Sequence, residues 1–165
     1  MSGWFIPISL FQGLPTGLQV IGPRSNLQRP ARSGIFTLMK TTTIKPQIYL
    51  VDDDEAVRKA LSRLLKAAGY VGEAFASAED FLAAVPPGSD GILLLDLRMP
   101  GIDGFELQKR LQILCPQLPV IFITGHFQAG DRKRALAAGA KGFLIKPFDG
   151  ETLLSLLESV ISEKK

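Results

Sequence analysis

The chain has one cysteine, one histidine and one tryptophan among its 165 residues, and these scarcities exclude several kinds of site. A lone Cys115 rules out an internal disulfide and fits a reducing compartment. His126 has no second histidine to work with, so a histidine-based metal centre is not indicated. No apolar run approaches the roughly 20 residues that span a bilayer, and we therefore expect a cytoplasmic protein that does not enter a membrane.

Acidic residues are missing from the first part of the chain. Residues 1–46 hold five basic residues and no acidic one, a net charge of +5. Residues 47–165 hold the other 14 basic residues against all 16 acidic ones, a net charge of −2. The basic pI of about 9.1 therefore comes from the first 46 residues, and we predict no sequence-specific binding of nucleic acid.

The first 46 residues also lack the periodicity of a helix or a strand. We expect residues 1–46 to form a disordered tail and residues 47–165 to form a single domain. Pro7 interrupts the first apolar run and no basic residue precedes it, which argues against a secretory signal. Two alternatives stay open. The composition also suits an organellar transit peptide, and Met39 offers an alternative start that would make the preceding residues an artefact.

From residue 47 onward, apolar runs alternate with stretches of helical periodicity. The runs predict strands at 47–52, 70–75, 92–96, 119–124 and 142–145, and the periodic stretches predict helices at 55–68, 77–85, 104–114, 129–138 and 150–162. Because the central runs are almost wholly apolar, helices should cover both faces of the sheet. The pattern predicts an α/β domain of five βα units around a doubly wound, five-stranded parallel sheet.

Polar side chains follow four of the five predicted strands. Asp52 and Asp53 come after the first, Asp96 after the third, Thr124 at the end of the fourth and Lys146 after the fifth. Since the carboxyl ends of parallel strands meet at one edge of a sheet, these groups should surround one crevice. Three carboxylates so close would repel one another without a cation, and oxygen ligands indicate a hard cation such as Mg²⁺.

Lys146 and Asp96 are the most informative of these residues. A half-buried ammonium needs a partner, and Lys146 would face Asp96. Pro147, directly after the lysine, favours a cis peptide bond there. Asp96 ends the most apolar run, where a rigid backbone suits a nucleophile, although an aspartate there could also cap the following turn. Asp54 is the better candidate for capping the first helix.

The order and spacing of these motifs resemble the receiver domain of two-component response regulators, over about residues 47–163. The similarity rests on Val51-Asp52-Asp53, on the run from Asp96 to Gly101, on Thr124-Gly125 and on Lys146-Pro147-Phe148. Segments 97–100 and 123–126 are similar to the FixJ-like branch of that family. The resemblance implies a flavodoxin-like (βα)5 fold.

The resemblance also implies a role for each site residue. Asp96 would be the phosphoacceptor. Asp53, Asp96 and the backbone carbonyl of Arg98 would bind Mg²⁺, with Asp52 as an outer-sphere partner. Thr124 would be the switch hydroxyl, Lys146 the phosphate counter-ion and Phe143 the aromatic switch residue, while Gly125 would leave room for the incoming group. Such a chain is a phosphoacceptor and not an enzyme, since it catalyses only its own phosphotransfer and autodephosphorylation.

A stand-alone receiver in a phosphorelay is the function that follows from this resemblance. A sensor histidine kinase would phosphorylate Asp96 and so switch the face formed by residues 129–138, 142–145 and 150–162 toward a downstream protein or a second copy of the domain. The run Arg132-Lys133-Arg134 would be either a solvated face or a charged rim for such a partner. Arg98 and His126 would tune hydrolysis of the acyl phosphate.

Rival functions remain beside this one. They are a receiver-like adaptor that is never phosphorylated and a fragment of a longer transcriptional regulator, because members of the branch usually carry a C-terminal helix-turn-helix. A hydrolase of the haloacid dehalogenase kind would need an acid where Arg98 stands. The tail at the front has no counterpart in the family.

Overall fold

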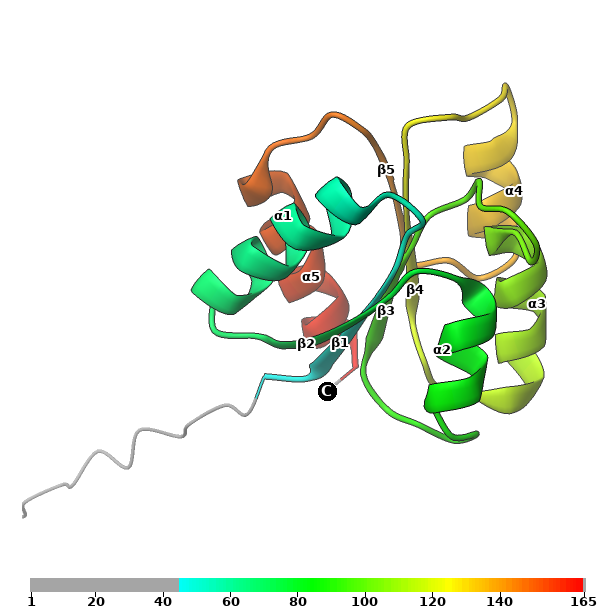
Figure 1. Cartoon of the computed structure of the whole chain (residues 1–165), viewed down its shortest axis with the longest axis horizontal. Coiled ribbons are helices and arrows are strands. Elements are labelled where there is room, and N and C mark those ends of the chain that lie inside the picture. Colours follow the sequence, from blue (N-terminus) through cyan, green and yellow to red (C-terminus); the bar gives the residue numbers. More distant parts are fainter. Residues whose placement is uncertain (1–44, 165) are drawn as a thin grey trace, which may run out of the picture. The chain divides into compact units, whose positions relative to one another are not determined.

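Five parallel strands form one sheet in the part of the chain that this computed structural model describes, residues 45–164. The strands are β1 (Gln47–Val51), β2 (Val71–Phe75), β3 (Ile92–Leu95), β4 (Val120–Thr124) and β5 (Gly142–Ile145), and the helices are α1 (Glu55–Ala67), α2 (Ala78–Ala84), α3 (Gly104–Leu114), α4 (Asp131–Ala137) and α5 (Gly150–Glu163). Strands and helices alternate along the chain (Figure 1). The prediction of five βα units is confirmed.

The strand order is β2-β1-β3-β4-β5. This is the order of the flavodoxin-like doubly wound folds, so the predicted fold class is confirmed. The chain builds the sheet outward from β1 in both directions, and β1 pairs directly with β3. Ligand sites in such sheets lie at the carboxyl ends of the strands, at the point where the order reverses. The ends of β1 and β3 therefore mark the expected site.

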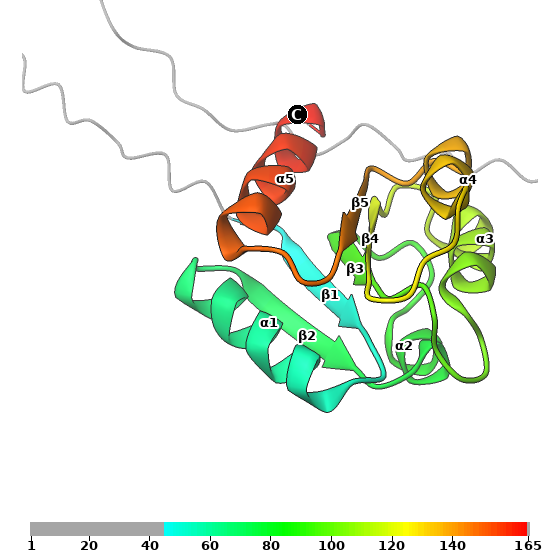
Figure 2. The ribbon, with the colours of Figure 1, turned by 90° about the horizontal axis from the view of Figure 1, so that it is seen from above.

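Helices cover both faces of the sheet. Helices α1 and α5 lie on one face and α2, α3 and α4 on the other (Figure 2). Successive residues of the central strands alternate between the two layers: Ile48 and Leu50 pack with α1 and α5, whereas Tyr49 and Val51 pack on the opposite side. All four residues of β3 are fully buried. Each such side chain contributes about 1.5–3 kcal/mol of apolar burial, which explains why these runs hold no polar residue.

Several element boundaries differ from the prediction by one or two residues, and two of these differences have a clear local reason. Helix α4 begins at Asp131 and not at 129, because Gly130 has a φ of +98°, a left-handed conformation that is not helical. Strand β2 begins at Val71 because the N–H of Tyr70 donates to the carbonyl of Leu65 and so belongs to the end of α1. Neither shift changes the topology.

The predicted tail lies almost wholly outside the described residues, and so do the hypotheses of disorder, a transit peptide and a start at Met39. Of residues 1–46 only Lys45 and Pro46 are described. Lys45 Nζ donates to the carbonyl of Ala68 at 2.6 Å and lies 4.1 Å from the centroid of the Tyr70 ring. Within residues 45–164, no helix has the length and apolar character that crossing a membrane requires.

Candidate functional site

The three aspartates after β1 have different positions: Asp52 and Asp53 lie at the crevice, and Asp54 caps helix α1. Asp52 is fully buried, and its Oδ1 accepts a hydrogen bond from the N–H of Asp54 at 2.9 Å. Arg58 donates to the backbone carbonyl of Asp52 at 2.6 Å. Asp53 is exposed. The carboxylate of Asp54 accepts two backbone N–H groups of the first turn of α1, so its predicted capping role is confirmed.

Asp96 stands directly after the buried strand β3. Its N–H donates to the carbonyl of Val51 at 2.8 Å, so the hydrogen bonding of the sheet holds its backbone in place. The residue is 7% exposed. Its Oδ1 accepts a long hydrogen bond from the N–H of Arg98 at 3.3 Å. The carboxylate is therefore held on a rigid support while one side of it stays open to the crevice.

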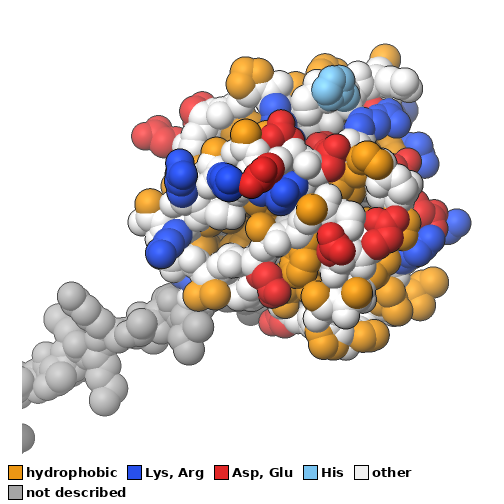
Figure 3. Space-filling model, viewed as in Figure 1, with side chains coloured by type: hydrophobic (Ala, Val, Ile, Leu, Met, Phe, Trp, Pro, Cys, Tyr) orange, Lys and Arg blue, Asp and Glu red, His pale blue; other side chains and the backbone are white. Residues whose placement is uncertain are grey.

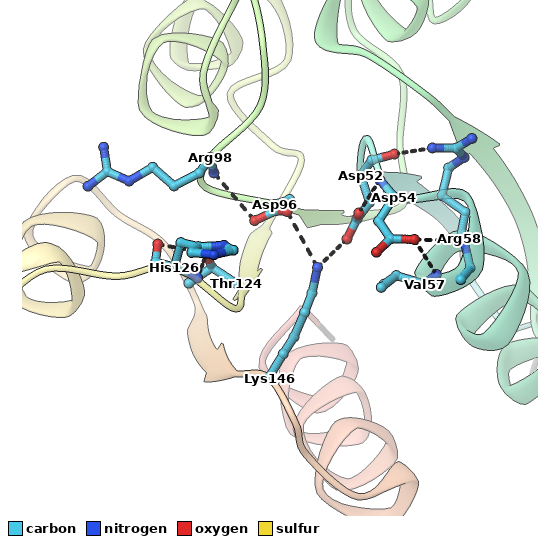
Figure 4. Close-up of polar contacts among 10 residues, drawn as sticks. Asp52, Asp54, Val57, Arg58, Asp96, Arg98, Thr124, His126 and Lys146 are labelled. Carbon is cyan, nitrogen blue, oxygen red and sulfur yellow. Dashed lines mark hydrogen bonds and ion pairs between the residues drawn. The ribbon is translucent and has the colours of Figure 1, made fainter.

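Lys146 directly follows β5, and its side chain extends toward the ends of β1 and β3, where it contacts two carboxylates (Figure 4). Its Nζ lies 2.5 Å from Oδ2 of Asp52 and 3.4 Å from Oδ2 of Asp96. The sequence indicated Asp96 as the partner of the lysine, whereas in the structure the shorter contact is to Asp52. The lysine therefore bridges the ends of β1 and β3. The peptide bond between Lys146 and Pro147 is cis.

The electrostatics of Asp52 are set by its burial. Burial raises the pKa of Asp52, and the hydrogen bonds from Lys146 and from the N–H of Asp54 only partly oppose that change. The ionised carboxylate is therefore costly to keep in the folded protein unless positive charge lies close to it. Lys146 supplies one such charge.

Three carboxylates meet beside Lys146. Asp52, Asp53 and Asp96 each offer an oxygen, and these oxygens all lie within 4.8 Å of one another. With one ammonium and three carboxylates, the crevice has a net negative charge. A donor set made only of oxygen atoms suits a hard cation such as Mg²⁺, so the residues present fit the ion that the sequence indicated.

The hydroxyl of Thr124 is bound to the loop that follows β4. Thr124 is fully buried, and its Oγ1 donates to the carbonyl of His126 at 3.0 Å and accepts from the N–H of His126 at 3.2 Å. The hydroxyl is thus engaged away from Asp96. The ring of Phe143 is buried with its centroid 6.1 Å from that of Phe122.

An open depression lies beside the carboxylates. It is lined by residues 125–128 and by Arg98. A Cβ atom added to Gly125 would meet Cβ of Lys146 at 3.9 Å, which is ordinary van der Waals contact. The depression therefore tolerates a small side chain at this position.

Sequence reasoning missed Asp131, the first residue of α4. Its side chain is 10% exposed, and its Oδ2 accepts from Nη2 of Arg98 at 2.8 Å and from the N–H of Gln128 at 2.8 Å. These two donors, the N–H of Gln128 foremost, lower the pKa of Asp131. Nothing in the sequence near Asp131 identifies Arg98 as its partner, because 33 positions separate them.

The three basic residues of α4 have different contacts, and both sequence-based alternatives for this run, a solvated face and a charged rim, stay predictions. The guanidinium carbon of Arg134 lies 3.9 Å from the centroid of the Phe105 ring, a stacked cation–π contact with α3. Arg132 and Lys133 are exposed. Figure 3 shows basic side chains beside the single histidine on this part of the surface. Arg134 is exposed too, but its guanidinium is held against Phe105, whereas no such contact is seen for Arg132 and Lys133 among the described residues.

Known proteins similar to this chain form a consistent group. Residues 48–158 match the family of response regulator receiver domains. The chain is 40% identical over 121 residues to the transcriptional regulatory protein FixJ of Bradyrhizobium diazoefficiens, in an alignment that covers 73% of this chain and 59% of FixJ. It is 38% identical over 132 residues to the response regulator protein TodT of Pseudomonas putida, covering 80% of this chain and 57% of TodT.

A solved structure agrees with these relatives. The non-phosphorylated HemR receiver domain from Leptospira biflexa superposes with a TM-score of 0.66 at 34% identity, covering 72% of this chain and 95% of that one. The present chain thus spans nearly all of an isolated receiver domain but less than two thirds of the length of the two curated relatives.

Proposed function

The chain belongs to the response regulator receiver domain family and acts in phosphorelay signalling, and from this premise we propose that Asp96 accepts a phosphoryl group from a phosphorylated histidine of a sensor kinase. The observation that carries the assignment to Asp96 is its place between two other carboxylates and the ammonium of Lys146. Asp52 is closed off by burial and by its contact with Lys146, and Asp53 has no ammonium facing it among the described residues. Asp96 alone combines both neighbours with an open side.

The transfer follows from this geometry. An oxygen of Asp96 would attack the phosphorus in line, forming an O–P bond while the P–N bond to the histidine breaks and its electron pair stays on the imidazole nitrogen. Lys146 would offset the charge on the phosphoryl oxygens. Asp53, Asp96 and the carbonyl of Arg98 would hold Mg²⁺, with Asp52 as an outer-sphere partner, and the bound ion supplies positive charge for the same oxygens. The product is an aspartyl phosphate.

Hydrolysis of that acyl phosphate would later return the domain to its starting state. Arg98 and His126 border the depression through which a water molecule would approach, so they would tune the rate. The domain would hydrolyse only the phosphoryl group on its own Asp96. A receiver that receives its signal from a kinase in this way would act in the cytoplasm.

Phosphorylation would change the contacts of Thr124. A phosphoryl group on Asp96 would offer acceptor oxygens to the Thr124 hydroxyl, which now donates to the carbonyl of His126. The loop after β4 would lose that bond and rearrange, and Phe143 would repack with it. The surface formed by α4, β5 and α5 would then present its exposed apolar residues, Leu136 and Ile145, to a downstream protein or to a second copy.

Magnesium is expected to stabilise the folded domain. At a concentration about ten times its Kd, binding adds about 1.4 kcal/mol, and Tm should rise by roughly 5 °C. Asp53→Asn should remove most of this increase because it replaces one of the three charged carboxylates by a neutral amide. Asp80→Asn, a substitution of an exposed aspartate in α2, should leave it unchanged. Thermal melts with and without Mg²⁺ test this, and an undiminished rise in Asp53→Asn would contradict the site.

The charged rim of α4 should matter only after phosphorylation. Sedimentation with beryllofluoride, a phosphoryl mimic, is expected to show self-association that Arg132→Glu/Lys133→Glu weakens. Arg134 is left intact because its guanidinium packs on Phe105. Association that does not need the mimic, or that survives the charge reversal, would show that the rim is only solvated surface.

A longer regulator is the second candidate. FixJ and TodT extend beyond the matched region, since the alignments cover 59% and 57% of them. This supports a receiver that works attached to an output domain, as in the transcriptional regulatory protein FixJ. Both candidates share the same site chemistry at Asp96.

A further inference from the structure

We propose that Asp131 is a positioning residue that holds the guanidinium of Arg98 away from Asp96, and that a phosphoryl group on Asp96 competes with Asp131 for that guanidinium. The inference rests on the proposed phosphorylation of Asp96 and adds a direct link from that site to helix α4. It is separate from the route through Thr124.

The two ends of Arg98 bind different parts of the domain. Its backbone N–H donates to Oδ1 of Asp96 at 3.3 Å, while its Nη2 donates to Oδ2 of Asp131 at 2.8 Å. Figure 4 shows the guanidinium directed away from Asp96 and from Lys146. A single residue therefore connects the carboxylate after β3 to the first turn of α4.

Asp131 is a junction of three segments. Its Oδ2 receives Arg98 from the loop after β3 and the N–H of Gln128 from the loop after β4, and the residue itself opens α4. Its side chain is 10% exposed and that of Arg98 is 38% exposed, so the carboxylate is mostly shielded from solvent while the guanidinium is partly accessible. A bond to a nearly buried carboxylate is screened less than a surface pair.

Helix α4 depends on this junction at its beginning. Asp131 and Ala135 are its only buried residues in the described structure. The C-terminal end is held separately, because Gln108 and Gln112 of α3 donate to the carbonyl of Ala138 at 3.1 and 2.9 Å. Loss of the Arg98 contact would therefore loosen the start of α4 and leave its end attached to α3.

A phosphoryl group is a strong competitor for the guanidinium. Arginine binds phosphoryl oxygens through paired, charge-assisted hydrogen bonds, and the new group would lie on the residue that Arg98 already contacts through its backbone. Asp131 would then keep only the N–H of Gln128. The loop after β4 would lose its contacts with Thr124 at the His126 end at the same time, while the bond from Gln128 to Asp131 would still hold its other end.

The competition between Asp131 and the phosphoryl group for Arg98 can be measured as a change in the affinity for a phosphoryl mimic. If Arg98 is shared between Asp131 and the phosphoryl group, then neutralising Asp131 must strengthen binding of a phosphoryl mimic at Asp96. Asp131→Asn keeps the size of the side chain and can still accept from Gln128. Beryllofluoride with Mg²⁺ should bind this variant of the full chain about fivefold more tightly than it binds the original chain, as for loss of a partly exposed ion pair of about 1 kcal/mol.

The experiment is a double-substitution cycle followed by amide NMR. In an Arg98→Gln background, Asp131→Asn should no longer change the affinity for beryllofluoride. In free Asp131→Asn, the amide signal of Ala135 should move toward its position in the beryllofluoride-saturated original chain. Lys109→Gln, which removes an exposed positive charge from α3, should leave the affinity unchanged.

Two results would overturn the proposal, and they differ from failure of the proposed function. The positioning role is refuted if Asp131→Asn binds beryllofluoride no more tightly, or if the gain persists without Arg98. If the original chain neither binds beryllofluoride nor is labelled at Asp96 by acetyl phosphate, phosphorylation itself is refuted and the positioning role with it.

Discussion

Asp96→Asn is expected to abolish incorporation of a phosphoryl group from acetyl phosphate and Mg²⁺. The substitution replaces the one carboxylate that has other carboxylates, the ammonium of Lys146 and an open side around it. An amide oxygen carries no charge and is a poor nucleophile toward phosphorus. Intact-mass measurement should show one added phosphoryl group on the original chain and none on the variant.

Two controls make this result specific. Asp80→Asn, in the exposed first turn of α2, should be labelled as fully as the original chain. Omission of the divalent metal should suppress labelling of every form. Labelling that survives Asp96→Asn would move the phosphoacceptor elsewhere, and an original chain that is never labelled would favour the adaptor that works without phosphorylation.

Lys146→Gln is expected to lower the free energy of unfolding of the metal-free domain by about 3 kcal/mol at mildly alkaline pH. Its Nζ contacts the fully buried Asp52 at 2.5 Å and Asp96 at 3.4 Å. Removing the ammonium leaves both carboxylates without their shared cation, and Asp52 is fully buried. Urea unfolding in a chelator measures the loss.

The loss should depend on pH with a definite sign. Burial already raises the pKa of Asp52 in the folded state, and removal of Lys146 takes away a contact that lowers it. A carboxyl group with a raised folded-state pKa favours the folded state below its unfolded pKa, and this contribution disappears as pH rises through the folded-state pKa. The deficit of Lys146→Gln should therefore be small in acid and largest above neutrality.

A second substitution tests whether the buried charge is the cause. Asp52→Asn/Lys146→Gln removes both partners, so the double variant should recover most of the stability that Lys146→Gln loses. A deficit that is equal at acidic and alkaline pH would point to lost packing of the lysine stem. A double variant that is less stable than Lys146→Gln would also show that the buried charge of Asp52 is not the cause of the loss.

Local signals account for what was predictable about the fold. Apolar runs identified β1, β3 and β4 most clearly, because a strand buried on both faces, such as β3, has almost no room for a polar side chain, whereas β2 holds Gly72 and Glu73 and is mostly exposed. Asp54 was predicted as a helix cap because a cap acts on N–H groups only two or three residues away. The start of α4 was misplaced because the left-handed conformation of Gly130 is decided by the loop before it.

The order of residues along the chain was enough to predict that three carboxylates, a threonine and a lysine lie at one edge of a parallel sheet. These residues stand at the carboxyl ends of four strands, and in a parallel sheet those ends lie at the same edge. The pairing of the groups came from the folded arrangement: Lys146 lies closer to Asp52 than to Asp96, Arg134 stacks on Phe105, and Arg98 bonds to Asp131. The difference lies in the range of the interactions. Periodicity and capping act over a few residues, whereas the choice among carboxylate oxygens within 4.8 Å of one another depends on side-chain distances that only packing between distant segments sets.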